Sequence, residues 1–411
     1  MRLVLAVLLA VNTLNIYDRV ALSALVEPVR REFHLTDAQI GLLTTLFTAV
    51  YALAGIPLGR LADTRSRRKL LAAGVAVWAS LTAAAGLAGS YAVLLATRLG
   101  VGIGEAVCAP AGVSWIGDLV PSGRRARALA VFMLATPLGS MLGPAVGGPV
   151  AQAWGWRAAL IVAALPALLL VPALLLLPEA GRAPATARDT DPPWALLRIP
   201  AFRWIVLSGA LLNFNLYALS AFLPAYMSRC HGWSLARAGL WTGLAIGAAG
   251  VAGGLLSAAF GDRAALHHPG GRMYMAAFAA AASAPAVCCG LLARAGSEAA
   301  LPLLATGNGL LVMYYGLVYA AIQDIVEPRR RGTAMSVYFL AMYLCGGAFG
   351  PLAVGRLSDW LARRDLLAGA AAEAARAAGL HGALYLVPAV SLVLAAVLWA
   401  GARSGNSGFR N

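Results

Sequence analysis

Apolar residues recur along the chain in stretches of about 20 residues, which short polar or charged segments separate. A helix of that length crosses a hydrocarbon core of ~30 Å, so each stretch predicts one transmembrane helix. We count twelve such stretches. The predicted spans are Leu3–Val29, Ala38–Leu61, Leu70–Ala88, Tyr91–Asp118, Ala126–Ala153, Trp156–Leu177, Phe202–Met227, Leu235–Phe260, Met273–Ala293, Leu301–Ile325, Thr333–Trp360 and Gly379–Ala402.

The composition indicates a polytopic membrane protein, because 60% of the 411 residues are hydrophobic and only 12% are charged. The net charge of +15 comes largely from arginines at span ends and in alternate loops, a pattern typical of cytoplasmic loops. We therefore expect no nucleic-acid partner, and we expect both termini on the cytoplasmic side of the inner membrane. Four of the five cysteines fall within apolar spans, so their spacing predicts neither a disulfide framework nor a zinc site.

An internal repeat divides the chain into two halves. The segment DLVPSGRRARA after the fourth span returns as DIVEPRRRGTA after the tenth, which pairs Asp118 with Asp324. The next helices repeat a Gly-x-x-x-Gly-Pro motif, at Gly139–Pro144 and at Gly346–Pro351. The chain is therefore predicted to consist of six spans, duplicated.

This repeat predicts an all-α membrane protein built from two pseudo-symmetric bundles of six helices. The predicted domains are residues 1–178 and 201–411, joined by a polar, proline-rich cytoplasmic linker at 179–200. Transporters use such parallel repeats, with the substrate bound near the middle of the membrane.

Two opposite charges lie inside the fourth predicted span. Arg98 and Glu105 stand at i and i+7, so one stripe of a continuous helix carries both. A charge near the bilayer centre costs at least about 2.5–3.5 kcal/mol, which makes such a residue a functional candidate that needs a partner. The nearest candidate partners are Asp18 and Arg19 in the first span, where Asn15 extends the polar face. A static ion-pair network that fixes helix register is the alternative.

The loop between the second and third spans, GRLADTRSRRK, holds five basic residues around Asp63. Asp63 can pair with Arg67 or Arg68, and a weaker copy of the loop occurs in the second half. A topology signal alone also explains the arginines. The repeated acid, however, favours an interaction that breaks and reforms during transport. The predicted gating residues are Asp63, Arg67, Asp118, Arg124, Asp262, Arg263, Asp324 and Arg330.

The second half carries polar and aromatic residues at helical spacing but no acid inside these helices. Asn213 and Tyr217 share one face of the seventh span, and Tyr315 and Tyr319 share one face of the tenth. These residues suit a substrate with an acyl chain and a polar end, although ordinary bundle packing explains each of them singly. The five histidines lie near span ends or in loops, so we expect no metal site and no cofactor.

The charged loop, its copy and the twelve spans together resemble the major facilitator superfamily, over essentially the whole chain. Gly139-x-x-x-Gly143-Pro144 is similar to the fifth-helix motif of antiporting members. Glycine-mediated helix packing is the alternative interpretation of that motif.

Within the superfamily, several segments resemble the Spinster-type lipid transporters, here in a bacterial homologue. They are NIYDR at Asn15–Arg19, RLGVGIGEA at Arg98–Ala106, SWIGD ending at Asp118, ATPLGSMLG, and LSAFLPAYM at Leu219–Met227. The resemblance implies proton-coupled transport of lysolipids or sphingoid lipid phosphates by alternating access. It also implies that Asp18 and Glu105 carry protons and that Arg19 and Arg98 meet the head group. An anionic substrate that competes for Arg19 would then couple binding to proton uptake.

Two other kinds of function remain open from the sequence. A multidrug or small-metabolite proton antiporter would share the fold and differ in its demand for an anionic head group. A membrane enzyme is disfavoured, because the sequence has neither a G-x-S-x-G nor an H-E-x-x-H motif. A non-transporting receptor or scaffold is disfavoured by the duplicated charged loops. The sequence has no G-x-x-x-x-G-K-[ST] motif, so we do not expect ATP to be the direct energy source. We expect a monomer whose partners are an amphiphilic or lipid substrate, protons and the surrounding membrane lipids.

Overall fold

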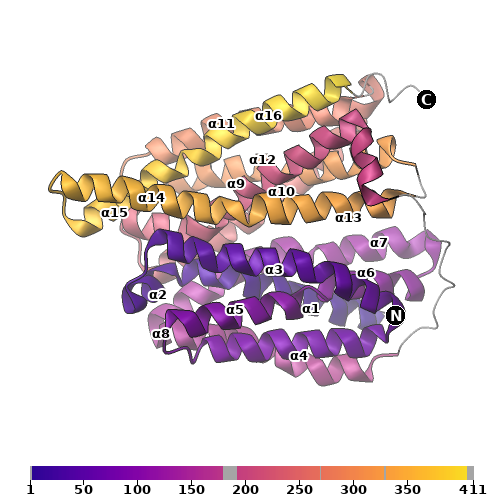
Figure 1. The fold of residues 1–411 in the computed structure, drawn as a ribbon, viewed down its shortest axis with the longest axis horizontal. Coiled ribbons are helices and arrows are strands. Elements are labelled where there is room, and N and C mark those ends of the chain that lie inside the picture. The colour runs from indigo at the N-terminus through magenta and orange to yellow at the C-terminus, as the bar shows by residue number, and fades with distance from the viewer. Residues whose placement is uncertain (1, 179–191, 269, 328–329, 405–411) are drawn as a thin grey trace. The chain divides into compact units, whose positions relative to one another are not determined.

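A computed structural model describes residues 2–178, 192–268, 270–327 and 330–404, and these ranges are helical with no β-strand (Figure 1). The helices of the first half are α1 (Arg2–Ala24), α2 (Val26–Phe33), α3 (Asp37–Thr64), α4 (Arg67–Ala85), α5 (Tyr91–Glu105), α6 (Cys108–Leu119), α7 (Ser122–Met133) and α8 (Ala135–Leu176). Those of the second half are the short η1 (Pro193–Arg198), then α9 (Pro200–His231), α10 (Leu235–His267), α11 (Gly271–Leu292), α12 (Ala300–Ile325), α13 (Arg331–Ala341), the π-helical η3 (Met342–Gly347), α14 (Phe349–Leu367), α15 (Ala372–Leu384) and α16 (Leu386–Ser404).

The predicted all-α membrane fold is confirmed. Ten helices within the described ranges are long and apolar enough to cross a membrane. One of them, Arg127–Leu176, contains two predicted spans, because Gly155 interrupts it with φ of 85°. The third predicted span corresponds to α4, a further helix of 19 residues. The described helices therefore account for all twelve predicted crossings.

The fourth predicted span, Tyr91–Leu119 in the structure, carries Arg98 and Glu105 on one helix as predicted, but a short turn follows Glu105. Helix α5 ends at Glu105 and α6 begins at Cys108, with a turn at Ala106 and Val107 between them. The expected stripe therefore stops at Glu105, at the end of a helix.

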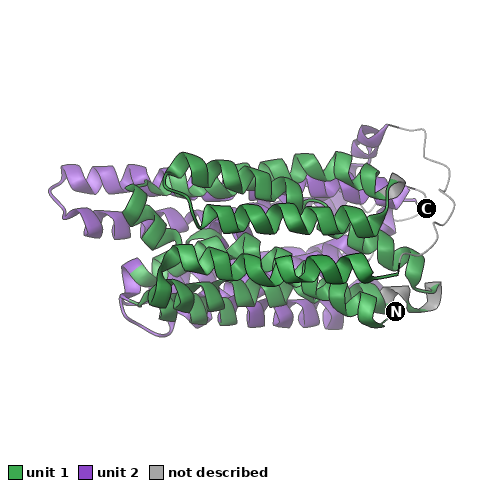
Figure 2. Cartoon of the chain, turned by 90° about the horizontal axis from the view of Figure 1, so that it is seen from below, with its two compact units in different colours: residues 1–186, 221–228, 233–244 green, residues 187–220, 229–232, 245–411 purple. Residues whose placement is uncertain are grey.

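The chain forms two compact units, coloured separately in Figure 2. Unit 1 comprises residues 1–186, 221–228 and 233–244, and unit 2 comprises 187–220, 229–232 and 245–411. Each unit has its own apolar core. The core of unit 1 includes Trp78, Trp115 and Phe132, and that of unit 2 includes Phe202 and Tyr314. Residues 179–191 of the predicted linker lie outside the described ranges, so the proposed domain limits stay a prediction.

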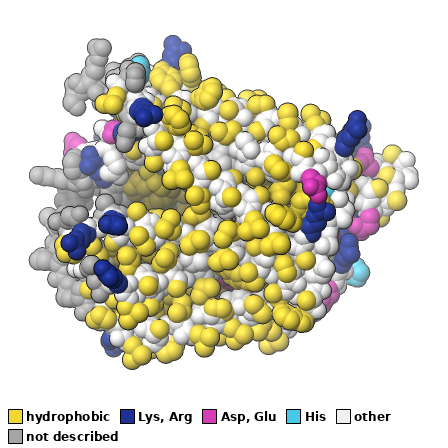
Figure 3. Space-filling model, turned by 180° about the vertical axis from the view of Figure 1, so that it is seen from behind, with side chains coloured by type: hydrophobic (Ala, Val, Ile, Leu, Met, Phe, Trp, Pro, Cys, Tyr) yellow, Lys and Arg dark blue, Asp and Glu magenta, His cyan; other side chains and the backbone are white. Residues whose placement is uncertain are grey.

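Large apolar side chains also lie on the outside, as a lipid environment requires. Leu169, Phe278 and Leu255 are 74%, 71% and 66% exposed. On the face shown in Figure 3, apolar side chains cover most of the surface and charged ones gather towards its two ends. A soluble protein would not present so much contiguous apolar surface to water.

The internal repeat extends to helix packing. In unit 1, a Cβ on Gly143 would lie 2.9 Å from the Tyr17 carbonyl of α1; in unit 2, the Phe214 carbonyl of α9 faces Gly350 in the same way. The preceding glycines of both motifs, Gly139 and Gly346, also face carbonyls of α1 and α9, one helical turn earlier. Helix α1 therefore corresponds to α9 in register, and the glycines are needed because the helix backbones approach closely.

This register assigns counterparts to the charged residues of unit 1. Asp18 follows Tyr17, so it corresponds to Asn215, which follows Phe214. When the two repeats are aligned on Asp118 and Asp324, Arg98 corresponds to Leu304 and Glu105 corresponds to Leu311. Both leucines are buried. The charges therefore belong to one of the two repeats.

Candidate functional site

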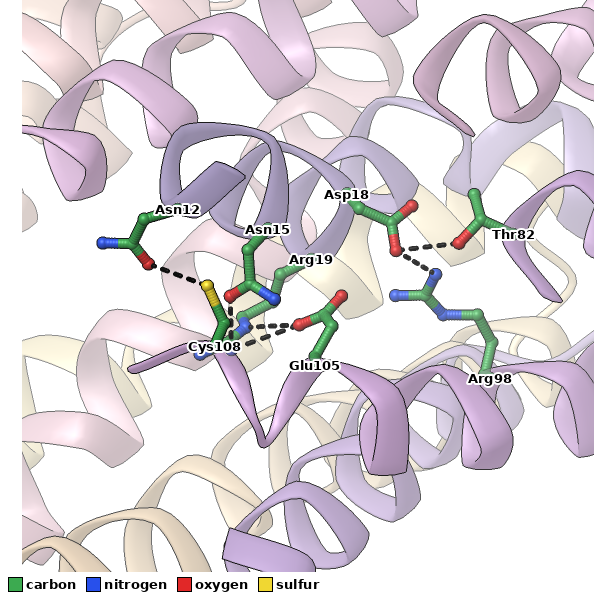
Figure 4. Close-up of polar contacts among 8 residues, drawn as sticks. All are labelled: Asn12, Asn15, Asp18, Arg19, Thr82, Arg98, Glu105 and Cys108. Atoms are coloured by element: carbon green, nitrogen blue, oxygen red, sulfur yellow. Dashed lines mark hydrogen bonds and ion pairs between the residues drawn. The ribbon is translucent and has the colours of Figure 1, made fainter. Parts of the chain in front are cut away.

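Helix α1 presents a row of polar side chains to the interior of unit 1 (Figure 4). Asn12, Asn15 and Asp18 are 6%, 2% and 2% exposed, and the Arg19 side chain is 8% exposed. Their burial inside a helix that crosses the membrane means that each needs polar partners from neighbouring helices.

Asp18 contacts two other helices through one carboxylate oxygen. Thr82 Oγ1 of α4 donates a hydrogen bond of 2.9 Å to Asp18 Oδ2. Arg98 Nη1 of α5 lies 3.5 Å from the same oxygen, and both members of this ion pair are 2% exposed. The Arg98 guanidinium also lies 5.0 Å from the centre of the Phe47 ring. Asp18 and Arg98 thus form a fully enclosed pair.

Arg19 and Glu105 form a second ion pair beside the first. Arg19 Nη2 and Nε lie 3.2 and 3.3 Å from Glu105 Oε2, and Arg19 Nη2 also donates to Asn15 Oδ1 at 3.4 Å. The guanidinium lies 4.1 Å from the centre of the Tyr51 ring. Glu105 is completely buried, and the charges of Asp18 and Arg98 also act on it. The break after Glu105 places this carboxylate at the end of α5, opposite α1.

Several polar atoms of this cluster have no hydrogen-bond partner within the described ranges, although they are buried. They are Asn15 Nδ2, Asp18 Oδ1, Arg98 Nε and Glu105 Oε1. Leaving such atoms unpaired is costly, so a cluster with several of them is suited to binding a ligand or a proton. The two arginines balance the two carboxylates, and any anion that enters must displace one of these contacts.

The sequence analysis missed several residues of this cluster. They are Thr82, the aromatic side chains of Phe47 and Tyr51, and Cys108, whose thiol donates to Asn12 Oδ1 at 3.7 Å. None had a signal of its own, because threonine, cysteine and aromatic residues are ordinary in apolar helices.

In unit 2, the predicted binding residues gather in one aromatic cluster. Tyr315 donates a hydrogen bond of 2.9 Å to Asn213 Oδ1, and its ring centre lies 5.5 Å from that of Tyr319. Tyr217 contacts Tyr343 at 6.2 Å between ring centres. The cluster also contains aromatic residues that the sequence analysis did not name: Tyr314, Tyr338, Phe339 and Tyr343.

Asn215, the counterpart of Asp18, is completely buried and makes a neutral contact. Its Nδ2 donates to Ser391 Oγ of α16 at 2.9 Å. Asn213 is equally buried, and its Nδ2 lacks a hydrogen-bond partner within the described ranges. Unit 2 therefore offers amides, hydroxyls and aromatic rings where unit 1 offers charges.

Two ion pairs at helix ends involve the predicted gating residues. Arg67 Nη1, at the start of α4, lies 2.5 Å from Asp118 Oδ2 near the end of α6. In unit 2, Arg272 at the start of α11 pairs with Asp324 near the end of α12. Because α4 and α11 hold corresponding places in the repeat, this contact is duplicated too. Arg272 was not among the predicted gating residues.

The predicted pairing of Asp63 and of Asp262 with neighbouring arginines stays a prediction. The side chains of Asp63 and Asp262 lie outside the part of the chain that the structure describes. Arg67 donates to Ser114, and Arg68 donates to the Leu177 carbonyl at 3.1 Å. The remaining predicted gating arginines are exposed or half-buried: Arg124, Arg263 and Arg330. Among the described residues, no group of three or more histidine, cysteine or acidic side chains could hold a metal.

Known proteins are similar to this chain in sequence and fold. A family model described as Major Facilitator Superfamily matches residues 8–351. A protein of Mycolicibacterium smegmatis described as an MFS-type efflux pump is 34% identical over 400 residues, which covers 96% of this chain and 90% of that protein. Protein spinster homolog 1 of Homo sapiens is 30% identical over 391 residues, covering 88% of this chain and 74% of that protein.

Solved structures agree. A bacterial homologue of the human lysosomal transporter Spinster, in an inward-facing and unoccupied conformation, matches with a TM-score of 0.88 and 26% identity, over 98% of this chain and 97% of that one. A D-xylose–proton symporter matches with a TM-score of 0.78 over 96% of both chains; at 18% identity, this likeness shows the fold alone.

Proposed function

The chain belongs to the major facilitator superfamily and is a Spinster-type secondary transporter, and on that premise we propose that it moves anionic, lipid-like amphiphiles by proton-coupled alternating access. The substrates we propose are of the lysolipid or sphingoid phosphate class. The observation that carries this proposal is the buried pair of Arg19 with Glu105, a cation that can bind a phosphate beside a carboxylate that can take up a proton.

The coupling follows from competition for one guanidinium. Arg19 presents several N–H groups in a planar fork that suits a phosphate as well as a carboxylate. When a phosphate engages Arg19, Glu105 loses the cation that stabilises its charge in a water-poor site, and it takes up a proton. When the phosphate leaves, the ion pair reforms and the proton is released. Asp18 is the second candidate for proton transfer, and Arg98 supports the site.

We propose that the aromatic cluster of unit 2 also takes part in substrate binding. Tyr217, Tyr315 and Tyr319 offer apolar ring surface with hydroxyl groups, next to the amide of Asn213. Such side chains bind an acyl chain and its polar end without adding a charge. In this proposal, unit 1 binds the anionic head group and the proton, and unit 2 binds the acyl chain. This assignment agrees with the replacement of the charged residues of unit 1 by neutral ones in unit 2.

Alternating access also needs contacts that break and reform at the helix ends. We assign this role to the Arg67–Asp118 pair and its counterpart Arg272–Asp324, together with the loops around Asp63 and Asp262. By the distribution of basic residues, these ends face the cytoplasm, as do both termini and the linker. We propose that the protein works as a monomer in the inner membrane.

A second candidate function is efflux of drugs or small metabolites in exchange for protons. The relative described as an MFS-type efflux pump favours it, at 34% identity. The two functions differ at Arg19, because a cationic drug gains nothing from a guanidinium, whereas a lipid phosphate binds it.

The deciding experiment is solute flux into proteoliposomes that contain the purified protein, with and without an imposed pH gradient. The panel consists of a lysophospholipid, a sphingoid phosphate and a permanently cationic drug. Accelerated flux of the two lipids supports the proposal. Flux of the cationic drug without lipid flux would establish the second candidate instead.

A further inference from the structure

Thr82 of α4 lies beside the charged cluster, and the sequence analysis predicted no function for it. It is completely buried, and its hydroxyl donates a hydrogen bond of 2.9 Å to Asp18 Oδ2, the oxygen that also faces Arg98. Its place is fixed, because a Cβ on Gly104 of α5 would lie only 2.8 Å from the backbone nitrogen of Trp78, one turn before Thr82 in α4. Close packing of α4 on α5 thus brings the hydroxyl to Asp18.

The two carboxylates of the cluster differ in what holds them. Asp18 receives a neutral donor and an arginine, and that arginine is itself only 2% exposed. Glu105 receives two N–H groups of Arg19, which also donates to Asn15, and the Asp18 carboxylate acts on Glu105 through its charge and a hydrogen bond. A donor fixed in place stabilises the ionised form of a carboxylate and keeps its orientation. Asp18 therefore has a support that Glu105 lacks.

We propose that Thr82 is a positioning residue that holds Asp18 ionised against Arg98, and that it thereby leaves Glu105 as the carboxylate that exchanges protons. This inference rests on the proposed function and divides its two candidate carboxylates into one fixed counter-ion and one exchanging acid. Each transport cycle then moves the proton of Glu105 alone, while the Asp18–Arg98 pair keeps α1 and α5 in register.

The surroundings of the two acids provide no other support of this kind. The segment Leu70–Ala85 of α4 has no titratable side chain, and neither does Ala135–Trp156 of α8, which packs on α1. Within the described residues, the polar contact that α4 makes with the two acids is the hydrogen bond from Thr82 to Asp18. The titratable and charged groups around the two carboxylates are Tyr17 and Arg19 of α1, Tyr51 of α3, Arg98 of α5 and Cys108 of α6.

The test uses Thr82→Val, which keeps the shape of the side chain and removes the donor, and Thr82→Ser, which keeps the donor. The matched control is Thr48→Val in α3, a threonine that is 1% exposed and whose hydroxyl has no hydrogen-bond partner within the described ranges. Infrared difference spectra of the purified proteins against pH report protonated carboxyl groups directly. Asp18→Asn and Glu105→Gln identify which band belongs to which acid.

In Thr82→Val, the Asp18 band should appear at a pH higher than in the wild type by about one unit, the size expected for one hydrogen bond to a charged group. Thr82→Ser and Thr48→Val should match the wild type. An Asp18 band at the same pH in Thr82→Val and wild type would overturn the proposal, as would a Thr82→Ser protein that behaves like Thr82→Val.

Gradient-driven lipid flux provides the second readout. In Thr82→Val, the acidic limb of the pH profile should move upward by about one unit, because Arg98 is released where Asp18 is protonated. In an Asp18→Asn background, Thr82→Val should add no further shift, which distinguishes loss of the donor from faulty packing. If the wild type transports without any response to a pH gradient, the proposed function fails. A coupled wild type with an unshifted profile in Thr82→Val refutes the role of Thr82 only.

Discussion

Asp18 in α1 and Asn215 in α9 occupy corresponding positions, since each follows the residue whose carbonyl faces the second glycine of a Gly-x-x-x-Gly-Pro motif. The two side chains have nearly the same shape, yet one is charged and faces Arg98, whereas the other is neutral and faces Ser391. The duplicated fold thus carries its charge handling in one repeat.

We predict that Asn215→Asp destabilises the protein strongly at neutral pH. The new carboxylate would be fully buried. It would have no counterpart of the Arg98 that faces Asp18 in unit 1, because Leu304 stands at the position that corresponds to Arg98. An uncompensated buried charge costs about 3–5 kcal/mol. Thermal unfolding in detergent measures the effect, with Asn215→Leu as the neutral control that loses the same hydrogen bond. An Asn215→Asp protein as stable as the wild type would mean that the register is wrong.

A second prediction concerns the close approach of α8 to α1. In Gly143→Ala, the new Cβ would lie 2.5 Å from Val20 Cγ2 and 2.9 Å from the Tyr17 carbonyl, so the helices must separate. We expect a loss of stability of about 1–3 kcal/mol, typical of overpacking. Gly55→Ala in α3 is the matched control, because nothing lies within 4 Å of its Cβ; it should gain up to about 1 kcal/mol from helix propensity. Equal melting temperatures for the two variants would contradict this packing.

The sequence predicted much of this architecture because the membrane imposes simple rules. Twelve apolar stretches and a duplicated loop were enough for the helices, and the break near Gly155 fell between two predicted spans. The charged residues were found for a related reason. An arginine or an acid inside an apolar helix is costly enough that it must serve a purpose and must find a partner.

The sequence did not predict which charged residue pairs with which. Whether Arg19 faces Glu105 or Asp18 depends on the rotation of α5 and on the break after Glu105, and both result from packing. Thr82 gave no signal, because a threonine in an apolar helix can satisfy its hydroxyl on its own backbone, as Thr97 does on Leu94. Tyr343 was missed in unit 2, since it lies in the π-helical turn, where regular helical spacing does not hold.

The third prediction compares the two ion pairs at the helix ends. The side chains of Arg67 and Asp118 are 9% and 11% exposed, whereas those of Arg272 and Asp324 are 19% and 42% exposed. Asp118→Asn should therefore slow transport about tenfold or more, because a largely buried charge-assisted contact is lost. Asp324→Asn should act more weakly, since water screens an exposed pair. Initial rates in proteoliposomes decide this, and a stronger effect of Asp324→Asn would contradict the assignment.

The fourth prediction concerns pH and Glu32, at the end of α2 outside the membrane spans. Hydrogen bonds from Arg157 and then from Trp156 hold the pKa of Glu32 below its ordinary value. A carboxyl whose pKa is lowered by folding contributes stability above its unfolded pKa of about 4.3, and this contribution is lost as the pH falls through the folded pKa.

The Glu32 contribution is small, about 0–1 kcal/mol, because this pair is partly exposed. We expect Glu32→Gln to lower the melting temperature slightly at neutral pH and to match the wild type in acid. The measurement is the difference between the two melting temperatures from neutral pH down to pH of about 3. A difference that stays constant over this range would show that Glu32 has no such role.

The most direct test of the central claim is whether substrate binding at Arg19 moves a proton onto Glu105. A lysophosphatidic acid is added to the purified protein in a weakly buffered solution, and a pH-sensitive dye reports protons taken up per lipid bound. The wild type should take up as much as about one proton per lipid, by linkage between binding and ionisation. Glu105→Gln should bind without proton uptake, and Arg19→Ala should lose binding. Undiminished proton uptake in Glu105→Gln, or lipid binding by the wild type without any proton uptake, would contradict the account.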